Sequence, residues 1–179
     1  MASMDSKVST DFLEFSRHKL LQQYWPRLRS AVEPLTDEQV WWRPNAACNS
    51  VGNLILHLNG NVGQWLVASF NQRKEHRDRP AEFNQREGIS TAALLNLLGA
   101  TMLEAEEVLA RLTEKDLIDQ FDVQGYEKCS GLRIVYQVVE HFGLHYGQIL
   151  YIVKTIQGED LGFYRELNQT GRAAGGRSI

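Results

Sequence analysis

The chain has 179 residues, of which 43% are hydrophobic, 19 are lysine or arginine and 22 are aspartate or glutamate. A chain of this length can bury a core without disulfides, so we expect a single domain over residues 1–179. The formal net charge of -3 argues against nucleic-acid binding, which usually relies on a basic face or arm.

The N-terminus and the spread of apolar residues argue against export and membrane insertion. The stretch MASMDSKVSTDF lacks a basic segment followed by an apolar one, and no run of about 18 apolar residues occurs. Cys48 and Cys129 form no C-x-x-C motif, so neither a disulfide framework nor a cysteine-based zinc site is indicated. We expect a cytoplasmic protein without a membrane or nucleic-acid partner.

The first predicted helix covers about residues 8–32. Its apolar residues recur at steps of four or seven: Leu13, Leu20, Tyr24 and Leu28. That spacing is typical of an amphipathic helix. Pro26 lies inside it and predicts a kink, because proline removes one helical hydrogen bond.

The second predicted helix begins after Ser50, a good N-cap residue. Its apolar side is formed by Leu54, Leu58, Val62, Trp65 and Leu66. Gly52, Gly60 and Gly63 lower its helix propensity, and close packing or a nearby ligand would explain them.

The third predicted helix opens at Ser90 or Thr91 and the fourth follows Ser130, with Gly158 as its C-terminal stop. The apolar stripe of the third helix is Leu94, Leu98, Met102, Ala105, Leu109 and Leu112. The stripe of the fourth is Ile134, Val138, His141, His145, Ile149, Ile152 and Ile156. Strand signals are nearly absent, so the chain is predicted to be an all-α four-helix bundle.

The connections between these helices are longer than bundle loops usually are. They span about residues 33–49, 71–89 and 113–130, long enough for short helical turns such as TDEQV and TEKDL or for a crossover. The Gly/Arg-rich end of the chain, about residues 166–179, is expected to be a mobile tail.

Two histidines one helical turn apart interrupt the apolar stripe of the fourth helix. His141 and His145 are spaced i, i+4, which places both rings on one face, where they can bind a single metal ion. An imidazole without a partner in an apolar interior costs roughly 1–3 kcal/mol, so both rings need one. A zinc protease is excluded, because its general-base glutamate would stand at Phe142.

A third ligand is available on the second helix. His57 lies at the edge of the apolar stripe there, and a polar file of Asn53, Asn61 and Gln64 continues on its side. A lone inward histidine is usually a core residue with a hydrogen-bond partner, but three on two core helices favour a metal site. A di-iron carboxylate bundle would need inward Glu-x-x-His pairs, which the second and fourth helices lack. His18 and His76 lie in charged surroundings and are predicted at the surface.

With these motifs the chain resembles the DinB-like superfamily, also called YfiT-like. The segment LTDEQVWWRPNAACNSVGNLILHLNGN is similar to that family's entry into its second helix, and HFGLHYGQI is similar to its H-x-x-x-H-x-x-Q-I motif. The resemblance implies metal ligands at His57, His141 and His145. It also implies an up-down-down-up bundle, a crossover between the second and third helices, and frequent homodimers.

Three neutral histidines can hold a divalent ion and leave positions open for water or substrate. Zinc and nickel are the metals we expect first, with iron and manganese as further candidates. Asn61, Gln148 and Tyr151 are candidates to orient the imidazoles or the substrate. Arg43 is a candidate to orient a carboxylate, although the Trp-Trp-Arg-Pro segment around it equally suits a cap on the bundle's end. Cys48 and Cys129 are expected to be packing residues rather than nucleophiles.

Two functions of different class remain open at this point. Characterised members of the family implied by the resemblance transfer a low-molecular-weight thiol, such as bacillithiol or mycothiol, or use one in an isomerisation. The first expectation is therefore a metal-dependent thiol transferase acting on a small electrophile. The alternatives are a metal-binding stress or sensor protein without turnover and a metal-dependent hydrolase.

Overall fold

Four long helical segments pack around one core in the computed structural model, which describes residues 4–74, 76–123 and 128–165. The first segment consists of α1 (Met4–Arg17), η1 (His18–Tyr24) and α2 (Trp25–Val32). The second consists of α4 (Val51–Asn61), η2 (Val62–Ala68) and α5 (Ser69–Asn71). The third and fourth are α7 (Thr91–Arg111) and α9 (Gly131–Gln157). The expected mobile tail, residues 166–179, lies outside the described residues.

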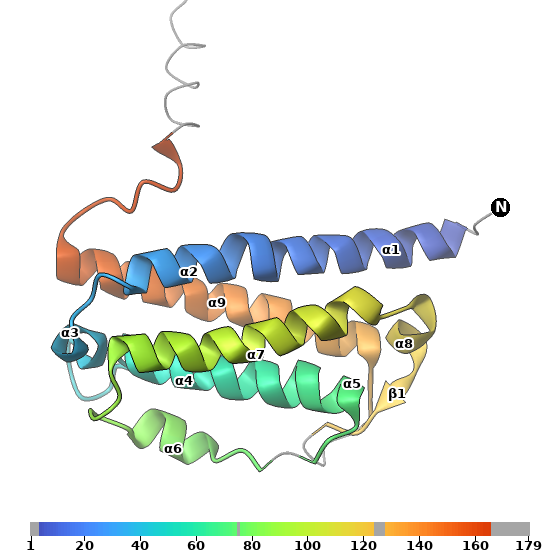
Figure 1. Cartoon of the computed structure of the whole chain (residues 1–179), viewed down its shortest axis with the longest axis horizontal. Coiled ribbons are helices and arrows are strands. Elements are labelled where there is room, and N and C mark those ends of the chain that lie inside the picture. Colours follow the sequence, from blue (N-terminus) through green and yellow to red (C-terminus); the bar gives the residue numbers. More distant parts are fainter. Residues whose placement is uncertain (1–3, 75, 124–127, 166–179) are drawn as a thin grey trace, which may run out of the picture.

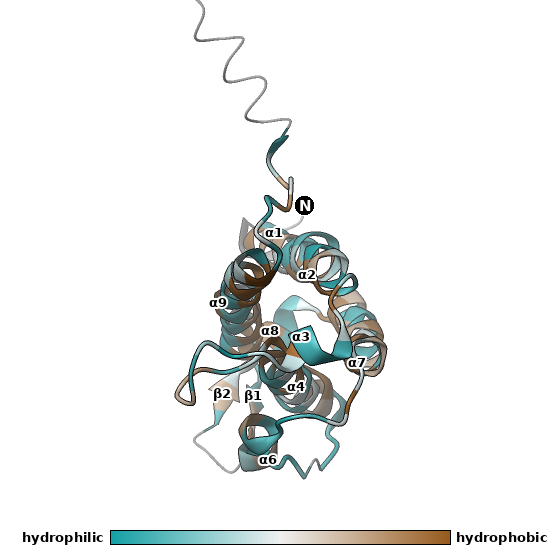
Figure 2. Cartoon of the chain, turned by 90° about the vertical axis from the view of Figure 1, so that its left-hand side faces the viewer, coloured by the Kyte–Doolittle hydropathy of each residue, from teal (hydrophilic) through white to brown (hydrophobic). Residues whose placement is uncertain are grey.

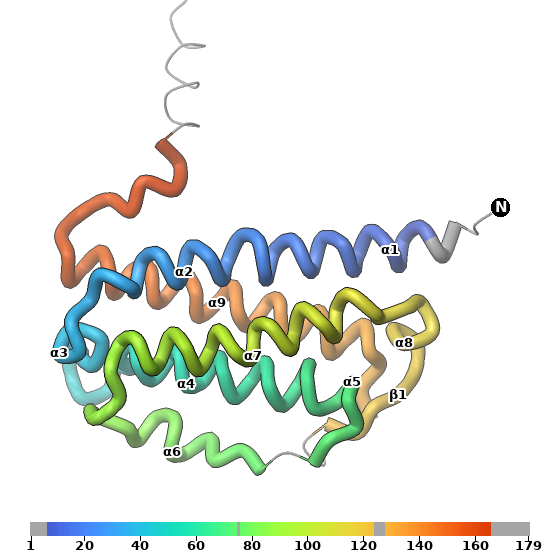
Figure 3. The backbone as a smooth tube through the Cα atoms, in the orientation of Figure 1, coloured from blue at the N-terminus to red at the C-terminus, as the bar shows by residue number. Residues whose placement is uncertain are grey.

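The directions of the four segments follow the order that the family resemblance implied. In Figure 1 the segment α1 to α2 and α9 run one way, whereas α4 and α7 both run the other way. The bundle is therefore up-down-down-up, and α4 and α7 need a long connection because each begins at the same end. Figure 3 traces this connection back along α4 to the start of α7.

Short elements occupy the long connections. They are α3 (Asp37–Trp41), α6 (Arg79–Asn84), α8 (Glu114–Ile118), and the strands β1 (Gln120–Phe121) and β2 (Cys129–Ser130), which pair antiparallel. Two of them, α3 and α8, coincide with the predicted turns TDEQV and TEKDL. The helix α6 belongs to the crossover and lies outside the four bundle segments, against α4 (Figure 2).

Local capping explains where the long helices begin and end. Ser50, Ser90 and Ser130 each accept a hydrogen bond from the backbone N–H three residues further on. Gly158 ends α9 with φ of 72°, a left-handed conformation that glycine adopts without a steric penalty. These boundaries agree with the sequence predictions.

The expected kink at Pro26 is replaced by a stretch of π-helix. Seven residues, His18–Tyr24, form the π-helix η1 directly before the proline, which lies in the first turn of α2. Proline is tolerated in a first turn, because its missing N–H has no obligatory partner there. The segment therefore continues from α1 through η1 into α2 without a break (Figure 1).

The core is a continuous cluster of aliphatic and aromatic side chains from all four segments. Fully buried members include Leu28, Leu54, Leu58, Leu94, Leu98, Ile134, Phe142 and Ile149. Trp41 closes one end of the bundle: its ring packs on Gly52, where a Cβ would come within 2.8 Å of it, and its Nε1 donates to the carbonyl of Ile89 at 2.8 Å. No helix within the described ranges is long and apolar enough to cross a membrane.

Candidate metal centre

Three imidazole rings from two helices meet at one place. His57 of α4 and His145 of α9 bring their Nε2 atoms to 3.1 Å and 3.2 Å from Nε2 of His141. One ring nitrogen of each residue lies within 4.8 Å of the other two. Such separations suit nitrogens that share one ion at about 2.0–2.1 Å, the usual distance from zinc to imidazole. The structure thus brings together all three histidines that the sequence singled out as metal ligands.

The depth of the three rings differs from the sequence prediction. His57, expected at the edge of its stripe, is buried with 4% of its surface exposed, because α6 covers α4 on that side. His141 and His145 were expected to point inward, but they are half-buried. The centre of the buried face of α9 is formed instead by Phe142 and Tyr146. The site therefore has a closed side at α4 and a side nearer to solvent at α9.

A buried carboxylate from the crossover holds the deepest histidine. Oε2 of Glu82 lies 2.8 Å from Nδ1 of His57, and both side chains are about nine-tenths buried or more. A carboxylate can only accept here, so Nδ1 of His57 carries a proton, and in the neutral ring Nε2 is then the nitrogen with the lone pair that a metal needs. A metal-binding histidine typically has such a partner, which fixes the ring and its tautomer.

The charge of Glu82 is balanced by a buried arginine. Arg77 donates from Nε to Oε1 of Glu82 at 2.5 Å and from Nη2 to Oε2 at 2.8 Å. Nη2 also lies 3.0 Å from Nδ1 of His57, but both atoms are donors once Nδ1 is protonated, so they form no hydrogen bond with each other. Burial by itself would raise the pKa of Glu82, but the hydrogen bonds from Arg77 and His57 outweigh it and lower the pKa.

Gly60 leaves the space that this pair needs. A Cβ at position 60 would lie 2.2 Å from Oε1 of Glu82 and 2.6 Å from Nε of Arg77. Only glycine lets both polar groups approach the α4 backbone this closely. Close packing therefore explains one of the glycines that weaken the helix propensity of this segment.

The outer partners of the two α9 histidines are unequal. Nδ1 of His145 lies 2.7 Å from Oε1 of Gln148, so the predicted orienting role of Gln148 agrees with the geometry. Nδ1 of His141 is buried and has no hydrogen-bond partner among the described residues. Oδ1 of Asn61, one turn beyond His57 on α4, is likewise buried without a partner in the described part of the chain.

Two other predicted orienting residues lie elsewhere. Tyr151 is 71% exposed on the outer face of α9, since it is six residues beyond His145 and the helix has turned it away from the core. Arg43 donates to Oδ1 of Asn53 at 2.7 Å and to the carbonyl of Gln85 at 3.1 Å. It ties the start of α4 to the end of α6, and its role in orienting a carboxylate stays a prediction.

The cysteines are not part of this centre. Cys48 and Cys129 are half-buried, and the only cluster of potential metal ligands among the described residues contains histidines alone. Their expected role as packing residues stays a prediction.

Residues 77–83 of the crossover were missed by the sequence reasoning. Asp78 accepts from the N–H of Ala81, and Pro80 lies in the first turn of α6. Asp-x-Pro is a common helix start, so the short helix was open to prediction from the sequence. The burial of Glu82 could not be predicted from the sequence, because Glu82 does not belong to a periodic apolar stripe.

The ring of His141 in the metal-free protein is expected to stay neutral well below pH 6.5. Burial, with the nearby His145 and His57, lowers the pKa of His141 to about 4, and burial also lowers the pKa of His145. The unfolded chain then binds a proton first as the pH falls, so this contribution to stability is complete above about 6.5 and is lost toward pH 4. An NMR titration of the chelator-treated protein measures the pKa of His141 directly. Protonation of His141 near pH 6.5 would contradict this prediction.

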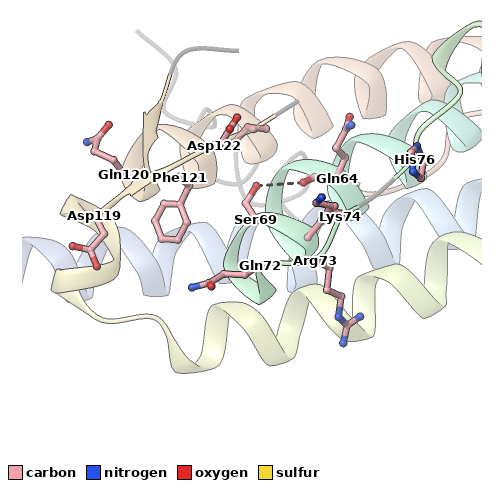
Figure 4. A pocket seen from close by; sticks show the side chains of 12 residues that line it. Gln64, Ser69, Gln72, Arg73, Lys74, His76, Asp119, Gln120, Phe121 and Asp122 are labelled. Carbon is pink, nitrogen blue, oxygen red and sulfur yellow. Dashed lines mark hydrogen bonds between the residues drawn. The ribbon is translucent and has the colours of Figure 1, made fainter. Parts of the chain in front are cut away.

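A cavity of about 770 Å³ lies between the end of the second bundle segment and the β1 region (Figure 4). It is lined by the end of the second bundle segment and by the β1 region, with Gln64 and His76 at one end and Asp119 and Gln120 at the other. None of the three clustered histidines lines it. Gln64 connects the two places, because its Oε1 accepts a hydrogen bond from Arg77 at 3.3 Å.

Comparisons with known proteins agree with this architecture. Two solved structures are similar at 14% identity and a TM-score of 0.63, which is evidence for the fold alone. One is a conserved protein from Enterococcus faecalis, and the match covers 88% of this chain and 100% of that one. The other is a DinB-like protein from Bacillus cereus, with 85% and 94% covered. No curated protein has a significant match to the sequence.

The family model of the DinB superfamily matches residues 20–149. The match extends over well more than half of the chain and contains His57, His141 and His145 together with the crossover that supplies Glu82. The bundle topology and the three-histidine cluster fall within the matched region, and the chain belongs to the DinB superfamily.

Proposed function

We propose that this protein is a metal-dependent transferase that moves a low-molecular-weight thiol onto a small electrophilic substrate. The observation that carries the proposal is the three-histidine cluster with one side near solvent, formed by the half-buried His141 and His145. A divalent metal bound there would lower the pKa of a coordinated thiol and so keep it as a thiolate at neutral pH. The family resemblance supports thiol transfer over other metal chemistry.

The residues of the chain prepare the site for this task. Glu82 keeps the proton of His57 on Nδ1, and Oε1 of Gln148 accepts a hydrogen bond from Nδ1 of His145, which leaves Nε2 of that ring free to bind a metal. The lowered pKa of His141 keeps its ring neutral and able to act as a ligand at pH 7. In the transfer the sulfur forms a bond to the electrophilic carbon, the leaving group takes the bonding electron pair, and the thiol proton passes to solvent.

Conjugation of monochlorobimane tests the proposal. Metal-loaded wild type should accelerate its reaction with at least one of bacillithiol, mycothiol, glutathione and cysteine. A thiol with a pKa near 8.5 is only a few per cent ionised at pH 7, so full ionisation alone predicts an increase of roughly thirtyfold. His141→Ala should lose the increase, and His18→Ala, altered at an exposed position on η1, should keep it.

If wild type and His141→Ala conjugate every thiol at equal rates, the transferase proposal fails. The two alternatives, a metal-binding protein without turnover and a metal-dependent hydrolase, then take its place. An ester and amide hydrolysis assay on the same two samples separates them.

We also propose that two chains associate through the outer face of α9. Four large side chains are exposed along this face, one or two helical turns apart: Leu132 at 47%, Tyr136 at 62%, Leu144 at 55% and Tyr151 at 71%. Gly147 lies on the same face, where even an added Cβ would meet nothing within 4 Å, so no bulk at this position holds a second helix away. Light scattering should give twice the chain mass of 20.4 kDa. The monomer mass at all micromolar concentrations would reject this association.

A further inference from the structure

One cation beside the three histidines has no counter-charge among the described residues. Arg79, the first residue of α6, is exposed and forms no hydrogen bond or ion pair with them. Arg77, two residues earlier, has its guanidinium buried and paired with Glu82. The two arginines therefore have different roles. Arg77 holds Glu82 in place beside His57, whereas Arg79 has all its N–H donors available to a ligand.

An aromatic ring holds Arg79 close to the histidines. Its guanidinium carbon lies 5.0 Å from the centre of the Phe83 ring, one turn along α6, and the Phe83 ring centre lies 4.6 Å from that of His57. A guanidinium stacked on an aromatic face loses less freedom when it binds a ligand. Arg79, Phe83 and His57 thus form three successive layers from solvent to the deepest histidine.

The electrostatic effect of Arg79 reaches the other two histidines as well. Burial is the main cause of the low pKa of both His141 and His145, and the positive charge of Arg79 lowers both further. The negative charge of Glu140 raises the pKa of His145 and so opposes this effect of Arg79. Because Glu82 is already neutralised by Arg77, a divalent ion at the histidines would leave this side of the molecule positively charged, which favours an anionic ligand.

We infer that Arg79 is the anion-binding group of the substrate site, so that the molecule held at the three histidines carries a carboxylate. The carboxylate would accept a two-point hydrogen bond from the guanidinium, while the thiol of the same molecule faces the histidines. This inference rests on the proposed function, since it takes the solvent side of the three histidines as the place where substrate binds.

Paired probes that differ only in charge test the inference by binding and not by turnover. Cobalt(II)-loaded protein is titrated with N-acetylcysteine and with its neutral amide, and binding is followed by the cobalt absorption bands. Wild type should bind the acid about tenfold or more tightly than the amide, the range expected for a charge-assisted hydrogen bond. Arg79→Gln should reduce this ratio to less than about threefold while its cobalt content stays unchanged, and Arg79→Lys should give an intermediate ratio.

Lys74→Gln is the matched control. Lys74 is an exposed cation of the same crossover, and it lines the 770 Å³ cavity but not the histidine cluster. The variant should keep the preference for the acid. If Lys74→Gln abolishes the preference and Arg79→Gln does not, the anion binds in the cavity and the assignment to Arg79 is overturned.

Failure of this inference is distinguishable from failure of the thiol-transfer proposal. Equal affinity of wild type for acid and amide overturns the role of Arg79, even if conjugation of monochlorobimane is observed. If neither thiol changes the cobalt bands, thiol binding itself is rejected, and calorimetry with succinate and succinamate decides about Arg79. Both of these carry one carboxylate for the metal, but only succinate has a second one for Arg79, so equal affinities would again overturn the inference.

Discussion

Replacing His57, His141 or His145 by alanine is expected to remove the bound metal. Wild type purified without chelator should carry about one divalent transition metal per chain, because three neutral imidazoles converge at 3.1 Å and 3.2 Å. Two histidines cannot replace three, so the loss in affinity should exceed the 10–100-fold that removal of an outer partner usually costs. Elemental analysis of each variant measures the metal content.

Metal-dependent stability provides a second measurement of the same prediction. A metal that binds only the folded chain raises its thermal midpoint, so added zinc should stabilise wild type and leave the three alanine variants unchanged. His18→Ala is the control, because its ring is exposed and its Nδ1 contacts only Gln22 among the described residues. Full metal content in all three single variants would refute the site.

Glu82→Gln is expected to weaken both the metal site and the fold. The substitution removes the negative charge that holds Nδ1 of His57, and loss of such a partner usually lowers metal affinity by about 10–100-fold. It also leaves the guanidinium of Arg77 buried without a counter-charge, where its side chain is only 8% exposed. Breaking a buried pair in this way costs about 3–5 kcal/mol of unfolding free energy. Urea unfolding of metal-free protein and a competition titration with a zinc chelator measure the two effects separately.

Glu104→Gln is the matched control for the stability effect. Glu104 pairs with Arg73 at 3.0 Å, but the two side chains are 48% and 64% exposed. A solvated pair of this kind contributes less than about 1 kcal/mol, and the variant should bind metal as wild type does. If Glu82→Gln unfolds at the same urea concentration as Glu104→Gln, the buried pair does not hold the site together.

The pH dependence of the metal-free protein should reflect Glu82 as well. Its pKa is lowered in the folded state, so its stabilising contribution is present above the ordinary glutamate pKa and is lost only as the pH falls below it. The contribution from His141 is lost earlier, between about pH 6.5 and 4. Two separate phases of acid destabilisation are the consequence, and Glu82→Gln should remove the one at lower pH.

Much of the bundle was predictable from the sequence because its signals are local. The apolar steps of three and four residues define helices, and Ser50, Ser90, Ser130 and Gly158 mark their ends through hydrogen bonds within a few residues. The i, i+4 spacing of His141 and His145 likewise places two rings together by helix geometry alone. The convergence of these rings with His57 was predicted from a third histidine, accompanied by a polar file, on another core helix.

The class of the fold and the three converging histidines could thus be predicted from residue patterns, whereas the surroundings of the histidines depend on how the crossover packs. The pairing of Glu82 with His57 joins residues 25 positions apart, and it forms only because the crossover folds back over α4. The same packing buries His57 and leaves His141 and His145 nearer to solvent, which reverses the depths expected from the periodicity. Periodicity reports which side of one helix faces a core, but it carries no information about what a separate segment will cover. A glutamate in a connector has no local pattern that distinguishes a buried partner from a solvated charge, so only the packed chain identifies it.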